Sequence, residues 1–241
     1  MSLATRATGA ELMDEPAADR AELLRALRDL RVVNRWLGGT RVMLRHLRGM
    51  ISRLPQESYR ILDVATGSAD IPLALAGWTR QRGLDVQILA TDAHPQTVAM
   101  ARELTSIEPS VAVEEADALA LPYMDDEFDF ALCSMALHHF DGEDAVQVLR
   151  ELDRVAAHGV VVSDLLRSRF GLWGARLLAA TLWRRSEFTR HDGPLSVRRA
   201  FTVAELRELA GAAGLRGARV RSHHLFRVSL VVDRTRSGDR R

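Results

Sequence analysis

The chain has 241 residues, 47% of them hydrophobic, and a formal net charge of +1, which suits one soluble domain with a helical extension. No run of about 18 apolar residues is present and the first residues lack the apolar centre of a signal peptide, so we expect a cytoplasmic protein without stable membrane insertion. All 33 basic residues are arginines, but aromatic residues do not alternate with them, so we interpret them as a compositional bias and expect no nucleic-acid partner.

The N-terminal part of the chain predicts two helices. Residues 1–16 are small and polar and predict a loose terminus. Apolar residues at three- and four-residue steps predict an amphipathic helix over residues 17–37, ended by the Gly38-Gly39 pair, and a second helix over residues 41–54 with Thr40 as its cap. These helices either lie over a cofactor cleft or pack on the flank of a sheet.

Strands and helices alternate through the middle of the chain. Apolar runs predict five strands, over residues 60–63, 85–90, 111–114, 128–133 and 159–162. Between them, helical patterns begin near residues 71, 96 and 143. Two further strand-like runs, 218–223 and 226–232, predict an antiparallel pair at the edge of the sheet. This alternation predicts an α/β fold with a doubly wound, mostly parallel sheet.

Residues 170–183 form the longest apolar stretch, which is too short to cross a bilayer. We expect a helix that either covers the cleft or forms a homodimer interface. Residues 190–194, Arg-His-Asp-Gly-Pro, predict a loop. Thr202 followed by Glu205 predicts a capping box that opens a helix through residue 213.

Polar side chains follow four of the predicted strands, namely Asp63, Asp92, Asp117 and Ser134. One aspartate at a strand end is most often a helix cap or turn former, but four such positions at the carboxyl edge of a parallel sheet indicate a shared cleft. Asp92 can accept both hydroxyls of a ribose, Asp117 an exocyclic adenine amine, and Asp63 can balance an ammonium group.

Four motifs carry a family resemblance: Leu62-Asp-Val-Ala-Thr-Gly-Ser-Ala-Asp70, Thr91-Asp92, Ala116-Asp117-Ala118 with Pro122, and Phe128-Asp-Phe-Ala-Leu-Cys133. Together they resemble the class I S-adenosylmethionine-dependent methyltransferases, most of all the group that includes the ubiquinone and menaquinone methyltransferases. The resemblance covers about residues 59–164, with a weaker echo in residues 201–215.

The resemblance implies a Rossmann-like methyltransferase fold that binds S-adenosylmethionine. It implies a helical extension over residues 1–55, a possible lid, and a methyltransferase domain over residues 56–241 with an apolar insertion at about 165–200. The cofactor-binding residues it assigns, together with the strand-end pattern, are Asp63, Ala65, Thr66, Gly67, Asp92, Ala93, Asp117, Ala118 and Ser134. A dinucleotide cofactor is disfavoured, because Asp70 stands where a pyrophosphate would approach the helix start.

Two departures from the family pattern bear on the site. Ala69 replaces the glycine that usually ends the first motif, and we expect it to crowd the cofactor slightly. Residues 135–141 lack the family's aromatic-glycine-arginine-asparagine pattern after the fourth strand. We therefore expect an acceptor other than that of the housekeeping quinone C-methyltransferases.

Histidines are the candidates for a catalytic base. A phenol has a pKa near ~10, so a base would assist methylation of its hydroxyl at neutral pH. His138 and His139 follow the fourth strand, and His191 lies in the predicted loop. A capping or core role for the first two is the alternative. His223 and His224 are adjacent in a strand, too close for a facing metal pair, and no metal site is expected.

We expect O-methylation of an aromatic, polyketide-like or quinone-like small molecule, with Trp36, Trp173 and Trp183 contributing to an apolar acceptor pocket. C-methylation of a quinone-like ring is the runner-up. A nucleic-acid methyltransferase is a further alternative, although Ser134-Met-Ala-Leu replaces the signature of amino-group methylation. A noncatalytic donor-binding module is the last.

Overall fold

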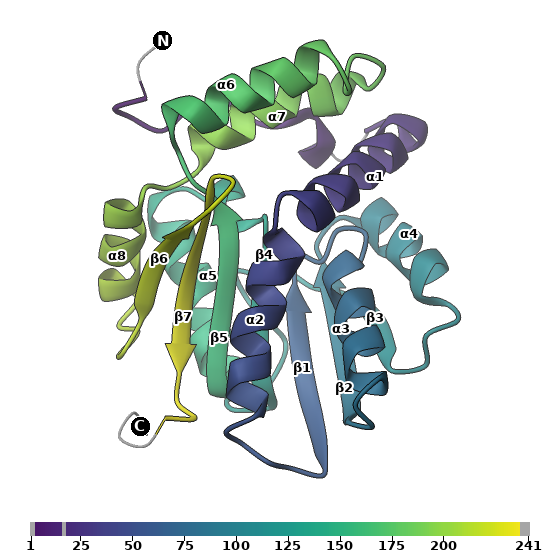
Figure 1. The fold of residues 1–241 in the computed structure, drawn as a ribbon, viewed down its shortest axis with the longest axis vertical. Helices are drawn as coiled ribbons and strands as arrows, with labels where there is room; N and C mark the ends of the chain where they lie inside the picture. Colours follow the sequence, from purple (N-terminus) through teal and green to yellow (C-terminus); the bar gives the residue numbers. More distant parts are fainter. Residues whose placement is uncertain (1–2, 16–17, 237–241) are drawn as a thin grey trace.

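The computed structural model describes residues 3–15 and 18–236, and its centre is a seven-stranded sheet (Figure 1). The strands are β1 (Ser58–Val64), β2 (Asp85–Asp92), β3 (Val111–Glu115), β4 (Phe128–Ser134), β5 (Ala156–Leu165), β6 (Arg219–His223) and β7 (Arg227–Asp233). Their order is β3-β2-β1-β4-β5-β7-β6, and β7 alone runs opposite to the other six strands. The predicted α/β fold and its antiparallel C-terminal pair are confirmed.

Helices cover both faces of the sheet, which explains why its central strands are apolar throughout rather than alternating. On one face lie α2 (Gly39–Ile51), α3 (Asp70–Arg80) and α4 (Pro95–Thr105), and on the other α5 (Gly142–Val155) and α8 (Val203–Ala212). The helix α2 crosses β5 closely at Gly159, where an added Cβ would lie 3.0 Å from the Met50 sulfur. The predicted capping box at the start of α8 is present in both directions.

A third layer lies across the carboxyl edge of the parallel strands (Figure 1). It consists of the short 3-10 helix η1 (Leu12–Asp14), α1 (Arg20–Trp36), α6 (Arg169–Ala180) and α7 (Glu187–Arg199). These segments contact one another, with α7 packed against α6, α1 and η1. The segments of this layer come from before and after residues 59–164, the region that the resemblance covers. The layer lies over the strand ends that carry the predicted site residues.

The prediction of a loose N-terminus is wrong for the described residues 3–15. Glu11 is 2% exposed, and Arg6 donates to the carbonyl oxygens of His138, Phe140 and Arg199. The segment is polar because its side chains and backbone bond to the carboxyl edge of the sheet. Local composition cannot distinguish such a strap from a frayed end. The prediction also covers residues 1, 2 and 16, which lie outside the described part.

The predicted cap of α2 is also wrong, because Gly38 rather than Thr40 precedes the helix. Gly38 has φ 84°, a left-handed conformation that glycine adopts without steric cost. The reversal between α1 and α2 needs this conformation, so the second helix begins at Gly39, two residues earlier than a threonine cap would place it.

The prediction of a loop over residues 190–194 is wrong, because these residues lie inside α7. Gly193 has a packing role there, because a Cβ at this position would lie 2.5 Å from the Trp183 ring. The Asp192 carboxylate accepts hydrogen bonds from the backbone of Leu12 and Met13 at 2.9 and 3.1 Å. These tertiary contacts outweigh the local breaking tendency of glycine and Pro194.

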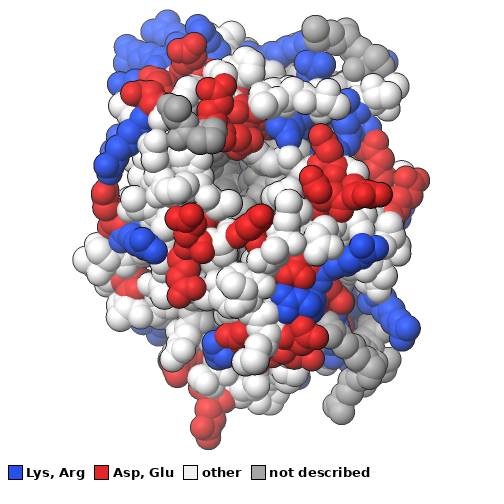
Figure 2. Space-filling model, turned by 180° about the vertical axis from the view of Figure 1, so that it is seen from behind, with Lys and Arg blue, Asp and Glu red and all other residues white. Residues whose placement is uncertain are grey.

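The surface seen from behind is charged and mixed in sign (Figure 2). Acidic side chains are spread over the middle of this face, and arginines gather mainly along its upper edge. Among the described helices, none has the length and apolar character needed to cross a membrane.

Candidate functional site

A cavity of about 700 Å³ lies between the carboxyl edge of the sheet and the layer that covers it. All nine residues predicted to bind the cofactor line it, and so do His138 and His139. His191 does not. It lies exposed on α7, with Nδ1 2.7 Å from Asp192 Oδ1, so its side chain is held on the outside of the covering layer.

The turn after β1 forms the floor of the cavity and holds a buried carboxylate. Ala65 and Gly67 both have positive φ, at 54° and 57°. Asp63 is 2% exposed, and its Oδ2 accepts a 2.6 Å hydrogen bond from Thr66. Its Oδ1 has no hydrogen-bond partner among the described residues. Burial raises the pKa of Asp63 to about 7, with the nearby carboxylates of Asp70 and Asp92 adding to it.

At the end of β2, Asp92 is fixed by the backbone. Its Oδ2 accepts from the Gly67 amide at 2.9 Å and its Oδ1 from the His94 amide at 3.0 Å. Each oxygen keeps acceptor capacity for a further donor, which is what two vicinal hydroxyls require. Burial raises the pKa of this carboxyl, and the two amide bonds oppose that effect.

Asp117 and Ser134, two further predicted positions, lie at the same end of the cavity as Asp63 and Asp92, the end expected to hold the methyl donor. Asp117 is exposed at the rim, where its Oδ1 accepts from the Leu119 amide at 2.9 Å. Ser134 lines the cavity with an Oγ that is buried and unpaired within the described part of the chain. Unsatisfied oxygens of Asp63 and Ser134 beside a fixed Asp92 fit a ligand that carries several donors, as S-adenosylmethionine does.

Ala69 does not crowd this cavity. It has φ 54° and is fully buried in the core between the sheet and α2 and α3, away from the cavity lining. The glycine usual at this position therefore relates to the left-handed backbone rather than to space for the cofactor. The expectation of crowding from Ala69 is wrong.

His138 forms a buried pair with Asp164 at the end of β5. The His138 Nδ1 lies 2.7 Å from Asp164 Oδ1, and the His138 amide donates to Oδ2 at 2.9 Å. Burial alone would raise the pKa of Asp164, but His138 and the backbone bonds hold it below the usual 3.8. An ionised carboxylate only accepts, so Nδ1 of His138 carries a proton toward Asp164, and Nε2 is the ring nitrogen left to exchange a proton with a ligand.

His139 sits in a different electrostatic setting. Its Nδ1 lies 2.7 Å from Asp14 Oδ2, and its Nε2 is 3.8 Å from Glu11 Oε2. Burial would lower the pKa of His139, but Glu11 and Asp14 raise it to about 9. His139 is therefore an imidazolium at neutral pH.

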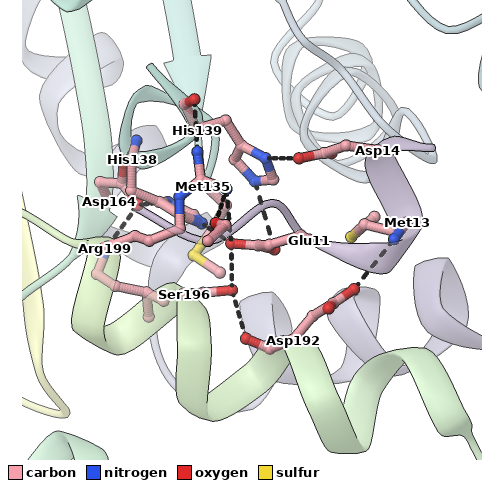
Figure 3. A network of polar contacts seen from close by, with 12 residues as sticks. Glu11, Met13, Asp14, Met135, His138, His139, Asp164, Asp192, Ser196 and Arg199 are labelled. Carbon is pink, nitrogen blue, oxygen red and sulfur yellow. Dashed lines mark hydrogen bonds and ion pairs between the residues drawn. The ribbon is translucent and has the colours of Figure 1, made fainter. Parts of the chain in front are cut away.

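Glu11 enters the site from the N-terminal segment (Figure 3). Its Oε1 accepts from Ser196 Oγ at 2.9 Å and lies 3.6 Å from His138 Nε2. Arg199 donates to the carbonyl oxygen of His139 at 2.6 Å, which fixes the turn that carries both histidines. The sequence gives no signal for Glu11 or Asp14, because nothing in residues 3–15 resembles a motif.

Glu11, His138 and His139 also form a donor set, since one ligand atom from each lies within 4.8 Å of the others. A metal ion there would have to displace the proton of His139, whose pKa is about 9. The protonated imidazole already has Glu11 and Asp14 as its partners. We therefore interpret the cluster as an ion pair rather than a metal site.

Two further residues near the site were not singled out from the sequence. Arg227 at the start of β7 is fully buried, and its guanidinium contacts the Asn34 side chain and the Met135 sulfur. Burial lowers its pKa to about 10, so it remains a cation. Asn34 in turn donates to Asp70 Oδ2 at 3.2 Å, which connects α1 to α3, the helix that follows the turn after β1.

The comparisons with known proteins agree with this geometry. Residues 61–159 match a family model described as a methyltransferase domain. Demethylmenaquinone methyltransferase of Deinococcus radiodurans is 36% identical over 119 residues, 48% of this chain and 47% of that protein. The ubiquinone/menaquinone biosynthesis C-methyltransferase UbiE of Rickettsia akari is 32% identical over 108 residues, 44% of this chain and 43% of that protein. The chain thus spans about half the length of the curated relatives it matches.

A solved structure supports the fold over a larger part of the chain. The plantazolicin methyltransferase BamL, solved with a desmethyl analogue of plantazolicin and SAH, has a TM-score of 0.65 at 12% identity, covering 89% of this chain and 96% of that one. The resemblance seen in the sequence is confirmed: residues 61–159 match a methyltransferase domain, and the chain shares its fold with a solved methyltransferase that holds SAH.

Proposed function

We propose that this protein transfers a methyl group from S-adenosylmethionine to a hydroxyl of an aromatic, polyketide-like or quinone-like small molecule. The observation that carries the proposal is the His138–Asp164 pair, 2.7 Å apart, in the wall of the same cavity as the donor-binding positions. A neutral imidazole held in this tautomer is suited to remove a proton from an acceptor.

The donor end of the cavity would hold the cofactor through three carboxylates. Asp92 accepts from the ribose hydroxyls, Asp117 from the adenine amine, and the unpaired Oδ1 of Asp63 faces the ammonium group. The cofactor supplies a methyl group activated on a sulfonium. Since that group needs no further activation, the protein's task is to align the acceptor and to ionise its hydroxyl.

His138 is the proposed base. The acceptor hydroxyl donates its proton to Nε2, and the ionised Asp164 stabilises the imidazolium that forms. His139 already carries a proton and cannot serve as base, so its charge instead favours a phenolate nearby. Of the three histidines proposed from the sequence, His191 is left without a role, because it lies outside the cavity.

The acceptor end of the cavity is apolar, which supports an acceptor with an aromatic ring or an alkyl chain. Leu30 and Val33 of α1, and Leu37 directly after it, line this end together with Leu178 and Trp183. The other two tryptophans expected in this pocket, Trp36 and Trp173, are instead 73% and 68% exposed. An acceptor of this kind fits the covering role proposed for α1 and α6.

C-methylation of a quinone-like ring is the second candidate, supported by the names of the relatives in Deinococcus and Rickettsia. Ionising a ring hydroxyl also activates the neighbouring ring carbon, so the same base serves both reactions. The position of the new methyl group in the product, read by NMR, separates them. A labelled methyl on carbon would reject the O-methylation proposal.

The experiment has two stages. Calorimetry with S-adenosylhomocysteine tests the donor site, where the wild type should bind and Asp92→Ala should not. A screen of phenols and quinols with labelled donor then identifies the acceptor. With that acceptor, His138→Ala should lose activity and His191→Ala, the matched control, should retain it. Equal activity of both variants would remove histidine from the mechanism.

A further inference from the structure

The acceptor end of the cavity opens through a ring of exposed apolar side chains. This apolar rim consists of Trp36, Phe170, Trp173, Leu177, Leu225 and Phe226, and its members are between 39% and 76% exposed. Three of them, Leu177, Leu225 and Phe226, also line the cavity, so the rim marks where the cavity meets the surface. Six large apolar side chains exposed near one another are unusual on the surface of a monomeric protein and indicate an interaction site.

The rim is assembled from three segments that pack against one another. Phe170, Trp173 and Leu177 lie on one face of α6 at helical spacing. The turn between β6 and β7 abuts this helix, because Phe226 lies against Gly171. The end of α1 abuts its other half, where Val33 packs in the same cluster as Ala179. The three segments that carry the rim residues are thus neighbours in the fold.

The charged residues that flank the rim residues of α6 and Trp36 in the sequence are arginines. No acidic residue occurs between Asp164 and Glu187, and the exposed positions of this stretch include arginines 169, 176, 184 and 185. Arg35 and Arg41 are exposed on either side of Trp36 in the sequence. The face seen in Figure 2 instead carries acidic and basic side chains together.

We propose that the apolar rim docks this protein on the surface of an anionic lipid bilayer, with the cavity opening toward the hydrocarbon region. Exposed tryptophans and arginines beside an apolar helix face are the side chains that suit the boundary between headgroups and acyl chains. A second copy of the chain is the weaker partner, since a two-fold contact through this face would bring its arginines together. Delivery of an apolar acceptor from the bilayer rests on the proposed function, whereas docking itself does not.

The test is flotation of the full-length chain with vesicles, without donor or acceptor. Vesicles of phosphatidylcholine with about 30% phosphatidylglycerol should carry the protein, and vesicles of phosphatidylcholine alone should carry far less. Each arginine near an anionic surface adds about fivefold to binding, so Arg169→Glu/Arg176→Glu should lower it more than tenfold. Raising the salt to about 1 M should weaken binding of the wild type.

The apolar contribution is tested with Phe170→Ser/Trp173→Ser, whose side chains do not line the cavity. This variant should lose at least tenfold in vesicle binding and keep its affinity for S-adenosylhomocysteine, which also reports that it folds. Ile107→Ser/Met124→Ser, two exposed apolar positions elsewhere, is the matched control and should bind vesicles like the wild type. Equal binding of all variants, or no binding to anionic vesicles, would overturn the proposal. So would a dimer in sedimentation that only the rim variant abolishes.

Failure of docking and failure of the proposed function give different results. If vesicles do not bind but labelled methyl transfer is observed, the rim proposal alone is wrong. If S-adenosylhomocysteine does not bind but vesicles do, the methyltransferase proposal is wrong and the docking surface stands.

Discussion

Replacing Asp63 by asparagine should stabilise the ligand-free protein at neutral and alkaline pH. Asp63 is 2% exposed, its Oδ1 has no partner in the described structure, and two other carboxylates lie near it. Burial raises its pKa from 3.8 to about 7. The amide of asparagine can keep the hydrogen bond from Thr66 through its carbonyl oxygen, and it carries no charge at any pH.

The magnitude follows from the two pKa values. The difference between 3.8 and about 7 corresponds to roughly 4 kcal/mol of unfolding free energy, at about 1.36 kcal/mol for each pH unit. The folded state resists losing the proton, so the wild type loses stability as the pH rises from about 4 to about 7, and the loss is complete above that. Asp63→Asn should therefore match the wild type near pH 4 and exceed it by up to about 4 kcal/mol at pH 8.

Urea unfolding followed by far-ultraviolet circular dichroism at several pH values between 4.5 and 8 measures this difference. Asp85→Asn, an exposed carboxyl at the start of β2, is the control and should show no such dependence. Asp63→Asn should also bind S-adenosylhomocysteine at least tenfold more weakly than the wild type, because the ammonium group of the ligand loses its counter-charge. A stability difference that does not change with pH would refute the reasoning about burial.

Three further predictions concern the acceptor end of the cavity and the layer that covers it. Asp164→Asn should lower the methylation rate by about 10²- to 10⁴-fold while S-adenosylhomocysteine binding stays unchanged, and a loss below fivefold would contradict the base assignment. Glu11→Gln should lower the pKa of His139 from about 9, as measured by NMR titration of the imidazole; an unchanged value would mean that Glu11 does not hold the proton there. Gly193→Ala places a Cβ 2.5 Å from a packed tryptophan ring and should destabilise the fold by about 1–3 kcal/mol. Gly211→Ala on α8, where no described atom lies within 4 Å of the added Cβ, should instead stabilise it by about 0.5–1 kcal/mol, and equal effects in urea unfolding would show that packing at Gly193 is unimportant.

Much of the donor end of the site could be predicted because its determinants are local. Asp63 and Asp92 each end a strand and begin a turn, so the strand pattern alone places them at one edge of a parallel sheet. Asp164 ends its strand in the same way and follows the same rule, but its pairing with His138 could not be inferred from the two positions separately.

Breaking signals were less reliable where tertiary contacts oppose them. Gly193 and Pro194 predict a loop, yet the packing of α7 against its neighbours keeps the helix continuous. The fifth strand is longer than its apolar run, because Ser163 and Asp164 pair with residues of β7 that lie far along the chain.

The sequence by itself determined the class of fold, the kind of methyl donor, and the strand-end residues that line the cavity, since these depend on periodicity and on residues adjacent in the chain. Only the tertiary structure decided the chemistry at the acceptor end. Asp14 and His139 are 125 residues apart, yet their contact, with Glu11 beside them, makes one histidine an imidazolium. The pKa of a side chain depends on burial and on neighbouring charges, and neither is written in the residues next to it.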